Sequence, residues 1–508
     1  MACRHRHFIA AGLAFALGTG GASADDSIHR YRAEHERQIL SDFRDFLSLP
    51  NVASSTPDMM ANAAWIERYI AKRGFTSQIV AEGGAPYVIA ERKQPGASQT
   101  ILIYAHFDGQ PAEPRNWSSP PFEPTLRDGP VELAGATINW ESLTTINPEW
   151  RIFARSAGDD KAPVIALMAA LDAMEAAGDV PSVNIKLILD GEEEAGSPTL
   201  DNILQKHADK LTADLMLFCD GPMHQSRMRQ LVFGVRGTMT VDLTAYGPAR
   251  PLHSGHYGGW APNPSEQLMR LLASMKDDDG RIIIPGYLDD VHPPTAAEQQ
   301  AISTLPNMDT ALKDELFLSK TEGGGKRVEE ISMGPSIIVK GFEGGGVGKQ
   351  SRNIIMPSAT ASVNLRLAPG QTPERVIARL NQFFSDQGFT LYSKPPTPEE
   401  RAVSSALYVD WRPGGYRAYR SDLGSAEAQK LVSILNRFDG KETLLTPTMG
   451  GSLPIYLFED TFPKMPIIIL PIANHDNNQH GRNENLRIQN LWDAIDVYAA
   501  VLLEYGKP

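Results

Sequence analysis

The sequence predicts an α/β fold in which a mixed sheet is interrupted by a separate α+β insert. Three observations support this prediction: short apolar runs typical of buried strands, helical stretches between those runs, and a central region in which apolar and polar residues alternate. The chain has 508 residues, and a single core usually stops growing at about 250 to 300 residues. We therefore expect two domains.

The predicted sheet is built from apolar runs that are short and continuous, as in parallel strands covered on both faces. These runs occupy residues 100–104, 183–189, 214–218 and 465–470. A helix is expected over 161–177, because Ala, Leu, Met and Ile follow one another there after Pro163. Gly178 then ends the stretch, as glycine often ends helices.

The stretch from about 238 to 419 has a different pattern. Period-2 alternation in 238–245 and 359–367 predicts half-buried strands, and helical patterns occupy 265–275 and 373–385. For the second helix, Thr372 is a suitable N-cap before Pro373. An α+β insert between two parts of an α/β domain indicates a lid or a dimerisation domain. Gly/Pro-rich passages at 248–264 and 341–348 are its expected loops.

We therefore divide the chain into a signal peptide, an α/β domain in two parts, and the insert. The boundaries are 1–24 for the signal peptide, 25–236 and 421–508 for the two parts of the α/β domain, and 237–420 for the insert. The polar, irregular region 286–335 within the insert has no role that the sequence reveals.

The N-terminus is typical of a secretory signal peptide. Arg4 and Arg6 form a basic start, residues 8–17 an apolar run, and Ala22-Ser23-Ala24 a cleavage site of small residues. The apolar run is well short of the roughly 20 residues that span a bilayer, which disfavours a membrane anchor. We expect cleavage after Ala24 and a periplasmic or secreted protein.

The mature chain is expected to be strongly acidic. The formal net charge is −13, and removing residues 1–24 takes away two arginines and no acidic residue, which leaves −15. This charge excludes nucleic acid as a reasonable partner. Cys219 is the one cysteine of the mature chain, so no disulfide can form within it. No later apolar run is long enough to span a membrane, so no membrane contact is expected after cleavage.

Acidic side chains and imidazoles follow all four strand-like runs. The carboxyl ends of strands are where ligands of open α/β sheets bind. The residues are His106 and Asp108 after the first run, Asp190 and Glu192 to Glu194 after the second, Asp220 after the third, and His475 and His480 after the fourth.

Each of these residues has an ordinary explanation when taken singly, because acids favour helix starts and a lone aspartate can be a cap. Together they would crowd one cleft with negative charge, which a protein tolerates when cations neutralise it. Oxygen and imidazole ligands without cysteine suit zinc, manganese or cobalt. A two-metal site also needs a bridging carboxylate, which Asp159 or Asp160 could supply.

The motifs resemble those of the M20 metallopeptidases, most closely the dipeptidase branch that includes carnosine-type and cytosolic nonspecific dipeptidases. The resemblance implies a zinc-peptidase-like catalytic domain, interrupted by a lid/dimerisation domain. It rests on motifs that occur in the family's order and approximate spacing over nearly all of the mature chain: His106-Phe107-Asp108, Asp159-Asp160-Lys161, Glu193-Glu194-Ala195-Gly196-Ser197, Asp220, His253-Ser254-Gly255, and His480 followed by Asn483-Glu484.

The resemblance also implies roles for individual residues. Asp159 becomes the carboxylate that bridges two divalent ions, zinc first, with manganese or cobalt as alternatives. The remaining ligands are His106 and Asp220 for one ion, and Glu194 and His480 for the other. Composition alone does not separate His480 from His475, and the Asn-Glu that follows decides for His480. Glu193 becomes the general base, and Asp108 hydrogen-bonds the far nitrogen of His106 to fix its tautomer.

Three further elements are implied to contact the substrate. His253 in the insert would stabilise the oxyanion, in its own subunit or in a partner's; without the resemblance it is more simply part of a turn. Arg366 would bind a substrate carboxylate, and its ordinary interpretation is a surface charge. Gly450, Gly451 and Ser452 would bind the same carboxylate, or form an ordinary turn.

Two positions depart from the family pattern. Ala154-Arg155-Ser156 stands where Gly-Arg-Gly is usual, and Ala162 stands where a glycine usually follows Asp-Asp-Lys. Neither departure removes a ligand. Each departure can change the local backbone geometry and the substrate specificity.

We therefore expect a two-metal hydrolase that cleaves the amide bond of dipeptides or short peptides with a free C-terminal carboxylate, using water activated by the metal pair. An N-acyl-amino-acid amidohydrolase is the first alternative. A non-catalytic exported metal- or peptide-binding protein is the second, although a binder has no need of the base Glu193. Homodimerisation through the insert is implied by the resemblance alone.

Overall fold

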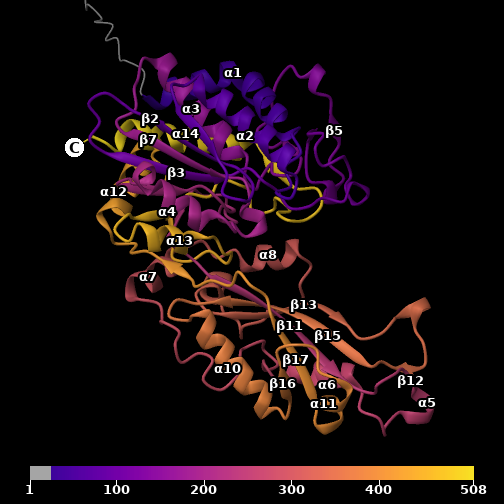
Figure 1. Cartoon of the computed structure of the whole chain (residues 1–508). Coiled ribbons are helices and arrows are strands. Elements are labelled where there is room, and N and C mark those ends of the chain that lie inside the picture. Colours follow the sequence, from indigo (N-terminus) through magenta and orange to yellow (C-terminus); the bar gives the residue numbers. More distant parts are fainter. Residues whose placement is uncertain (1–23, 508) are drawn as a thin grey trace, which may run out of the picture.

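The computed structural model of the chain describes residues 24–507 and shows a large α/β domain from which a smaller α+β domain projects (Figure 1). The predicted signal peptide lies almost entirely outside these residues. Among residues 24–507, no helix combines the length and apolar composition that crossing a bilayer requires.

The large domain is organised by an eight-stranded mixed sheet. Its four central strands, β7, β3, β8 and β20, are adjacent and parallel, and they are the four strands that the apolar runs predict. Parallel neighbours place their carboxyl ends at one edge of the sheet. In spatial order the strands are β1 (Thr76–Val80), β2 (Tyr87–Arg92), β7 (Asn184–Asp190), β3 (Thr100–His106), β8 (Leu215–Phe218), β20 (Ile467–Ile469), β9 (Gln230–Val232) and β19 (Leu444–Thr446).

Helices cover both faces of this sheet, because successive side chains of each strand point to opposite sides. In β3, Ile101 and Ile103 join one buried cluster, whereas Leu102 and Tyr104 join another. On the first face lie α1 (Ala24–Leu47), α2 (Thr56–Ala71), α3 (Ala162–Ala177), α12 (Ala426–Asp439) and α14 (Ile488–Glu504). On the second face lie α4 (Leu200–Leu211) and α13 (Ile455–Thr461). As predicted, α3 ends at Gly178, whose φ is 76°.

A smaller four-stranded sheet supports the loop that carries His480. This sheet joins the segment before Asp159 to the segment after His480, so it places both loops beside one another. Its strands, in spatial order, are β21 (Asn485–Arg487), β6 (Arg151–Phe153), β4 (Thr125–Arg127) and β5 (Thr137–Ile138).

The chain enters and leaves the insert through a short antiparallel pair, β10 (Gly234–Val235) and β18 (Tyr419–Arg420). The insert has its own sheet and its own apolar core, against which α6 (Pro264–Ala273) and α10 (Pro373–Asp386) pack. The Thr372 side chain caps α10 as predicted. The strands, in spatial order, are β13 (Ser336–Glu343), β15 (Ser358–Leu367), β11 (Gly237–Tyr246), β17 (Ala406–Trp411) and β16 (Thr390–Tyr392).

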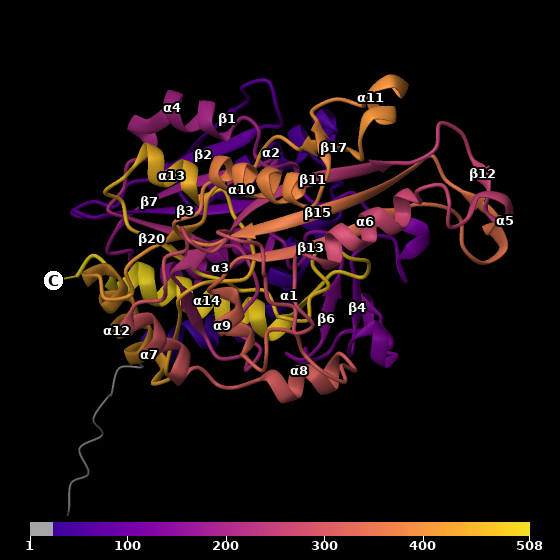
Figure 2. The same ribbon diagram turned by 90° about the horizontal axis from the view of Figure 1, so that it is seen from below.

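Two details of the insert differ from expectation. The expected loop at 341–348 is wrong in its first part, because β13 continues to Glu343 through an irregularity in its pairing with β15. The Gly/Pro-rich passage 248–264 includes β12 (Leu252–His253) and the short α5 (Ser254–Tyr257), and β12 pairs with β14 (Ile354–Ile355). These elements form the far tip of the insert in both views (Figures 1 and 2).

Region 286–335, which had no assigned role, returns from the insert to the large domain. It contains α7 (Ala296–Thr304), α8 (Asp309–Glu315) and α9 (Val328–Ser332), and α7 packs against β19. The carboxylate of Glu298 on α7 lies 3.1 Å from the guanidinium of Arg420, and both side chains are largely buried. The region therefore spans the two domains.

Candidate metal centre

Two groups of ligand atoms meet at the carboxyl edge of the main sheet. The first consists of His106, Asp159 and Asp220, and the second of Asp159, Glu194 and His480. Within each group the ligand atoms lie within 4.8 Å of one another. The structure thus brings together the residues that the family resemblance names for each ion, with Asp159 in both groups.

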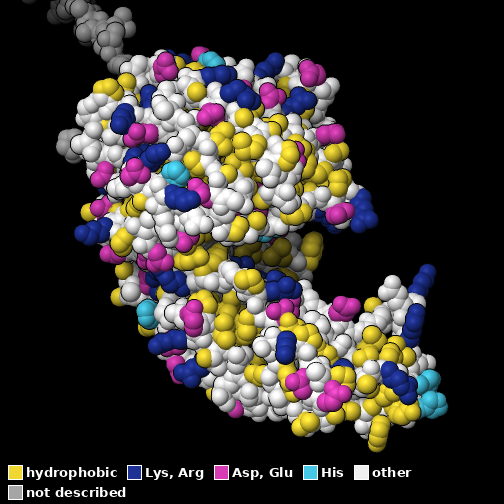
Figure 3. All heavy atoms as spheres, in the orientation of Figure 1, with side chains coloured by type: hydrophobic (Ala, Val, Ile, Leu, Met, Phe, Trp, Pro, Cys, Tyr) yellow, Lys and Arg dark blue, Asp and Glu magenta, His cyan; other side chains and the backbone are white. Residues whose placement is uncertain are grey.

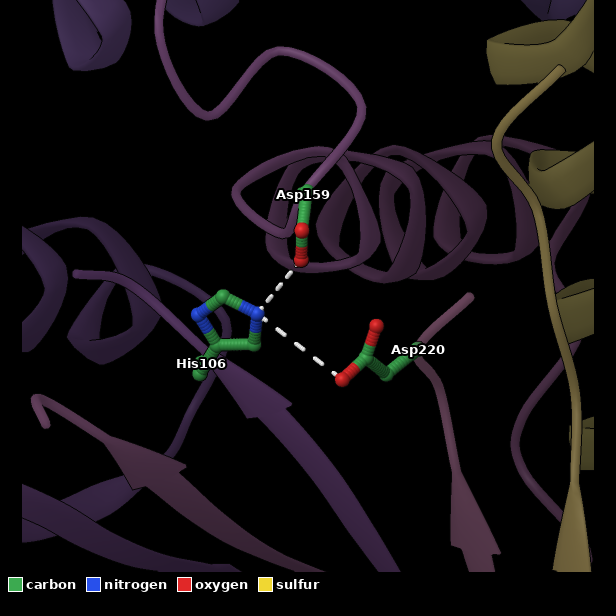
Figure 4. A group of neighbouring side chains, drawn as sticks. All are labelled: His106, Asp159 and Asp220. Carbon is green, nitrogen blue, oxygen red and sulfur yellow. Dashed lines mark hydrogen bonds and ion pairs between the residues drawn. The ribbon is translucent and has the colours of Figure 1, made fainter. Parts of the chain in front are cut away.

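The first group is held by rigid elements and is buried (Figure 4). His106 is the last residue of β3, Asp220 follows β8, and Asp159 precedes α3. The Nε2 atom of His106 lies 2.7 Å from Oδ1 of Asp159 and 3.8 Å from Oδ2 of Asp220. Because β3 and β8 are neighbouring parallel strands, the sheet itself brings the imidazole and the Asp220 carboxylate together.

The second group lies on loops, and its member His480 is exposed to solvent. Glu194 belongs to a single 3₁₀ turn after β7, and His480 lies in the loop between β20 and β21. The Nε2 atom of His480 lies 3.1 Å from Oδ2 of Asp159 and 3.2 Å from Oε2 of Glu194. The two oxygens of Asp159 therefore face different imidazoles, as a bridging carboxylate requires.

The spacing of these atoms fits divalent ions. Four-coordinate zinc with bonds of about 2.0 to 2.1 Å holds its ligands about 3.3 Å apart. The four separations given above, 2.7, 3.8, 3.1 and 3.2 Å, scatter around that value. The donor atoms are imidazole nitrogens and carboxylate oxygens, which suit zinc, manganese and cobalt.

Burial makes this cluster electrostatically costly by itself. Burial raises the pKa of Asp220 to about 7 and that of Glu194 to about 8, and the neighbouring Asp159 charge contributes to both shifts. Burial would also raise the pKa of Asp159, but hydrogen bonds with His106 and His480 outweigh it and hold that pKa below its usual range. Divalent cations would stabilise the carboxylates in their charged form.

Glu193 and Asp108 both lie beside the ligand groups. Glu193 lines the same cavity as Asp159 and Asp220, and burial raises its pKa well above the usual value. Oδ1 of Asp108 lies 3.2 Å from Nδ1 of His106, the nitrogen that faces away from the ligand group. The Asp108 carboxylate also accepts hydrogen bonds from the backbone N–H groups of Glu193 and Glu194, each at 3.0 Å. Asp108 therefore orients an imidazole and the acidic turn together.

The departure at Ala154-Arg155-Ser156 leaves the ligands supported. Arg155 donates to the buried carboxylate of Glu484 at 2.6 Å and to the carbonyl of Gly481. The other oxygen of Glu484 accepts from the backbone N–H of Asp159 at 3.0 Å. One buried ion pair thus fixes the backbone beside both Asp159 and His480. The second departure, Ala162, is the first residue of α3.

Sequence reasoning missed two amide side chains that contact the second group. Gln479 Nε2 donates to Oδ2 of Asp159, and Gln110 Nε2 donates to Oε2 of Glu194, each at 2.8 Å. Gln479 directly precedes His480, but a glutamine in a loop carries no signal of such a contact by itself.

A cavity of about 570 Å³ joins the ligands to the predicted substrate residues. Its wall includes Arg366 and residues 450–452, and Arg366 Nη1 lies 2.5 Å from Oγ of Ser452. Figure 3 shows the molecule hollowed between the large domain and the insert. Residues of both parts line the cavity, so a substrate would contact both.

Region 286–335 supplies another part of the cavity wall, which the sequence did not indicate. Val328, Glu329 and Ser332 of α9 line it, and Oε1 of Glu329 lies 3.4 Å from Nε2 of His224 in the large domain. These contacts are long-range, so they leave no local pattern in the sequence.

The structure does not bring His253 to the ligand groups of its own chain. His253 lies in β12, which forms the far tip of the insert (Figure 1). Its side chain is exposed. His475, the competitor of His480, belongs to neither ligand group, and its Nε2 atom lies 3.4 Å from Oε2 of Glu315 on α8. Of the predicted site residues, His253 is the one that the chain places elsewhere.

Comparisons with known proteins agree with this geometry. The sequence model of peptidase family M20/M25/M40 matches residues 102–504. The Cys-Gly metallodipeptidase of Schizosaccharomyces pombe is 25% identical over 424 residues, which cover 82% of this chain and 82% of that protein. The Beta-Ala-His dipeptidase of Mus musculus is 26% identical over 436 residues, which cover 83% and 80%. The structure of an M20 family metallo-carboxypeptidase from Sulfolobus solfataricus matches with a TM-score of 0.74 at 25% identity, covering 92% of this chain and 99% of that one.

Proposed function

The chain belongs to peptidase family M20/M25/M40, and from that premise we propose that it is a two-metal dipeptidase acting on substrates with a free C-terminal carboxylate. One observation carries the proposal. A single cavity contains the shared ligand Asp159, the acid Glu193 and the carboxylate-binding candidates Arg366 and Ser452. A short peptide can span such a site, with its carboxylate at one end and its scissile amide at the other.

The proposed chemistry divides between ions and side chains. Divalent ions bound to the two groups would polarise the scissile carbonyl and make water more acidic. Glu193 accepts the proton of the attacking water and delivers it to the departing nitrogen. Asp108 keeps Glu193 in place through the backbone of the acidic turn.

Substrate binding is assigned to the opposite wall. Arg366 presents a planar guanidinium, which can bind a carboxylate through two parallel hydrogen bonds. The hydroxyl of Ser452 is adjacent to it. A dipeptide bound there has its amide bond within the same cavity as Glu193, which favours exopeptidase action on short substrates.

The function is tested by a substrate panel on protein loaded with zinc, manganese or cobalt. The panel includes Cys-Gly and β-Ala-His, the dipeptides in the names of the two relatives, other dipeptides, their C-terminal amides, and N-acyl amino acids. We expect hydrolysis of free dipeptides. Hydrolysis of N-acyl amino acids alone would instead identify an amidohydrolase.

Glu193→Gln separates an enzyme from a binding protein. We expect kcat to fall about 10²- to 10⁴-fold, the usual contribution of a general base, while the metal content measured by mass spectrometry stays at the wild-type value. A variant with unchanged turnover would contradict the role of Glu193.

We also propose a homodimer in which His253 of one copy completes the site of the other. The tip that carries His253 is exposed and remote from its own ligand groups (Figure 3). Beside it, β13 is the edge strand of the insert sheet and exposes Ile338, Val339 and Phe342, an arrangement that favours pairing with a second chain.

Mixed dimers test this arrangement. Glu193→Gln and His253→Ala chains are each expected to be nearly inactive, but half of the dimers formed after unfolding and remixing would contain one of each. Each such dimer has one site with both groups, so activity recovers to about a quarter of the wild-type value if the dimer is a symmetric pair. No recovery, or a fully active monomer in light scattering, would contradict the proposal.

Export is proposed from the signal-like residues 1–24. Expression in a Gram-negative host followed by fractionation and N-terminal sequencing tests it. We expect periplasmic protein that begins at Asp25, and full-length protein in the cytoplasm would contradict export.

A further inference from the structure

Arg236 occupies the junction between the large domain and the insert. It lies between β10 and β11, where the chain crosses from one domain into the other. Its Nε and Nη2 atoms donate to the carbonyl of Gly450 at 2.9 and 2.7 Å, and its backbone N–H donates to the carbonyl of Gly451 at 3.1 Å. Its Nη1 atom donates to Oγ of Ser336, the first residue of β13, at 3.2 Å. One residue therefore ties two consecutive carbonyls of the cavity wall to the insert.

These hydrogen bonds determine where the neighbouring amides point. In a trans peptide the N–H is directed opposite to the carbonyl of the same unit. Because the Gly450 and Gly451 carbonyls face Arg236, the N–H groups of Gly451 and Ser452 face away from it. Within residues 24–507, neither N–H donates to a protein acceptor, although both residues line the cavity. Two consecutive N–H groups without a protein acceptor are available to bind an anion.

The charged side chains around this wall also favour the binding of an anion. Arg366 lies on the same wall and contacts Ser452, and within residues 24–507 neither Arg236 nor Arg366 forms an ion pair with a carboxylate. Burial, followed by repulsion from Arg366, lowers the pKa of Arg236 to about 10. Both guanidiniums remain charged at neutral pH and neither is paired with a described carboxylate, so this part of the wall is cationic.

We propose that Arg236 is a positioning residue that orients the amides of Gly451 and Ser452 for the carboxylate of the substrate. The inference rests on the proposed function and adds a residue to it. Arg236 itself does not line the cavity, and it acts through the two carbonyls that it holds. Because it is also bound to Ser336 of the insert, it fixes the amides relative to Arg366, which the insert contributes.

Arg236→Lys is the main test, because lysine keeps the charge but cannot make the paired hydrogen bonds to Gly450. For a dipeptide that the wild type cleaves, we expect KM to rise about tenfold, the cost of one such interaction, with kcat changed less than about threefold. The inhibition constant of the same dipeptide's C-terminal amide should stay at its wild-type value, since the amide has no carboxylate to lose. A merely structural role would weaken both ligands together.

Arg229→Lys is the matched control. Arg229 is also a largely buried arginine that holds backbone carbonyls, those of Leu435 and Lys441, but it lies outside the catalytic cavity and pairs with Asp439. We expect its KM and amide inhibition constant to equal those of the wild type.

A milder variant provides a second test in case Arg236→Lys fails to fold. Ser336→Ala removes one partner of Arg236 and leaves the Gly450 contacts, so we expect KM to rise about two- to threefold by partial loss of one hydrogen bond. Unchanged KM in both variants, or equal losses for the dipeptide and its amide, would overturn the inference. A wild type that cleaves no dipeptide would instead contradict the proposed function, so the two failures are distinct.

Discussion

The two ligand groups that share Asp159 differ in how the fold holds them. The His106 side chain is fully buried at the end of a central strand, whereas the His480 side chain is 57% exposed on a loop. His480 also has a φ of 60°, in the left-handed region that residues other than glycine rarely adopt. The main sheet positions the first group, whereas the position of the second group depends on the loop that carries His480.

This difference predicts that the two ions bind with unequal affinity. Ligands on rigid, buried elements are already in position before an ion arrives, so little conformational entropy is lost on binding. Ligands on an exposed loop must be ordered first, and solvent reaches them more easily. We therefore expect the ion at the second group to bind more weakly and to exchange faster than the ion at the first.

The largest effect is expected from a change at Asp159, the residue that both ligand groups share. Asp159→Asn keeps the shape of the side chain but removes the charge that both groups use. Turnover should fall by at least about 10³-fold, since a metal supplies several kcal/mol to such reactions. Mass spectrometry should show loss of both ions, whereas Asp209→Asn, an exposed change on α4, should alter nothing. A variant that still holds two ions would show that Asp159 is not the bridge.

Removing one histidine from each group sharpens the comparison. In the metal-free protein, His106→Ala leaves buried carboxylates without their partner and should lower the free energy of unfolding by about 3 to 5 kcal/mol. His480→Ala should cost less than His106→Ala, because the His480 imidazole is 57% exposed and water can replace part of its contact with Asp159 and Glu194. Urea unfolding measures both, and equal losses would contradict the difference in burial.

The two glutamines give a smaller effect confined to one group. Gln110→Ala and Gln479→Ala each remove a hydrogen bond to an oxygen of the second group, so the weaker ion should bind about 10- to 100-fold more weakly. Calorimetric titration should show the tighter site unchanged. Gln110→Ala is the stricter case, because Glu194 belongs to the second group alone, and equal weakening of both sites in this variant would contradict the prediction.

The smallest effect concerns the loop that carries His480. Burial would raise the pKa of Asp476, but the hydrogen bond and charge of Arg151 outweigh it and lower that pKa to about 2. A lowered folded-state pKa stabilises the protein above the unfolded value near 3.9 and loses this contribution as pH falls toward 2. Asp476→Asn should therefore lower the free energy of unfolding by about 1 kcal/mol at pH 7 after solvent screening.

That stability difference should shrink below about pH 4, where the unfolded chain begins to take up the proton. Urea unfolding of both proteins from pH 7 to pH 3.5 measures it, with the exposed Asp386→Asn of α10 as a control. A difference that does not change with pH would contradict a role for the Asp476 charge.

The same contrast explains what the sequence could predict. Two members of the first group follow from local pattern, because apolar runs mark the strands and the residues after them, His106 and Asp220, meet at one edge. The third member, Asp159, was separated from Asp160 by the family resemblance. The second group needed the context of a family motif, since composition did not distinguish His480 from His475.

The remaining features depend on contacts between distant segments. Gln110 reaches Glu194 and α9 reaches the cavity through packing that no local periodicity encodes. The strand through Glu343 was missed because its glycines are typical of a loop, and the pairing with β15 overrides that tendency. The distant position of His253 likewise follows from the length of the insert sheet rather than from its own motif.

Release of ions to a chelator tests the account most directly. Zinc-loaded protein is mixed with a chelator, and free and bound zinc are followed with time and by mass spectrometry. The account predicts two ions per chain that leave in two phases, the faster one abolished in His480→Ala. A single ion per chain, or two ions that leave together and are equally affected by His480→Ala, would contradict it.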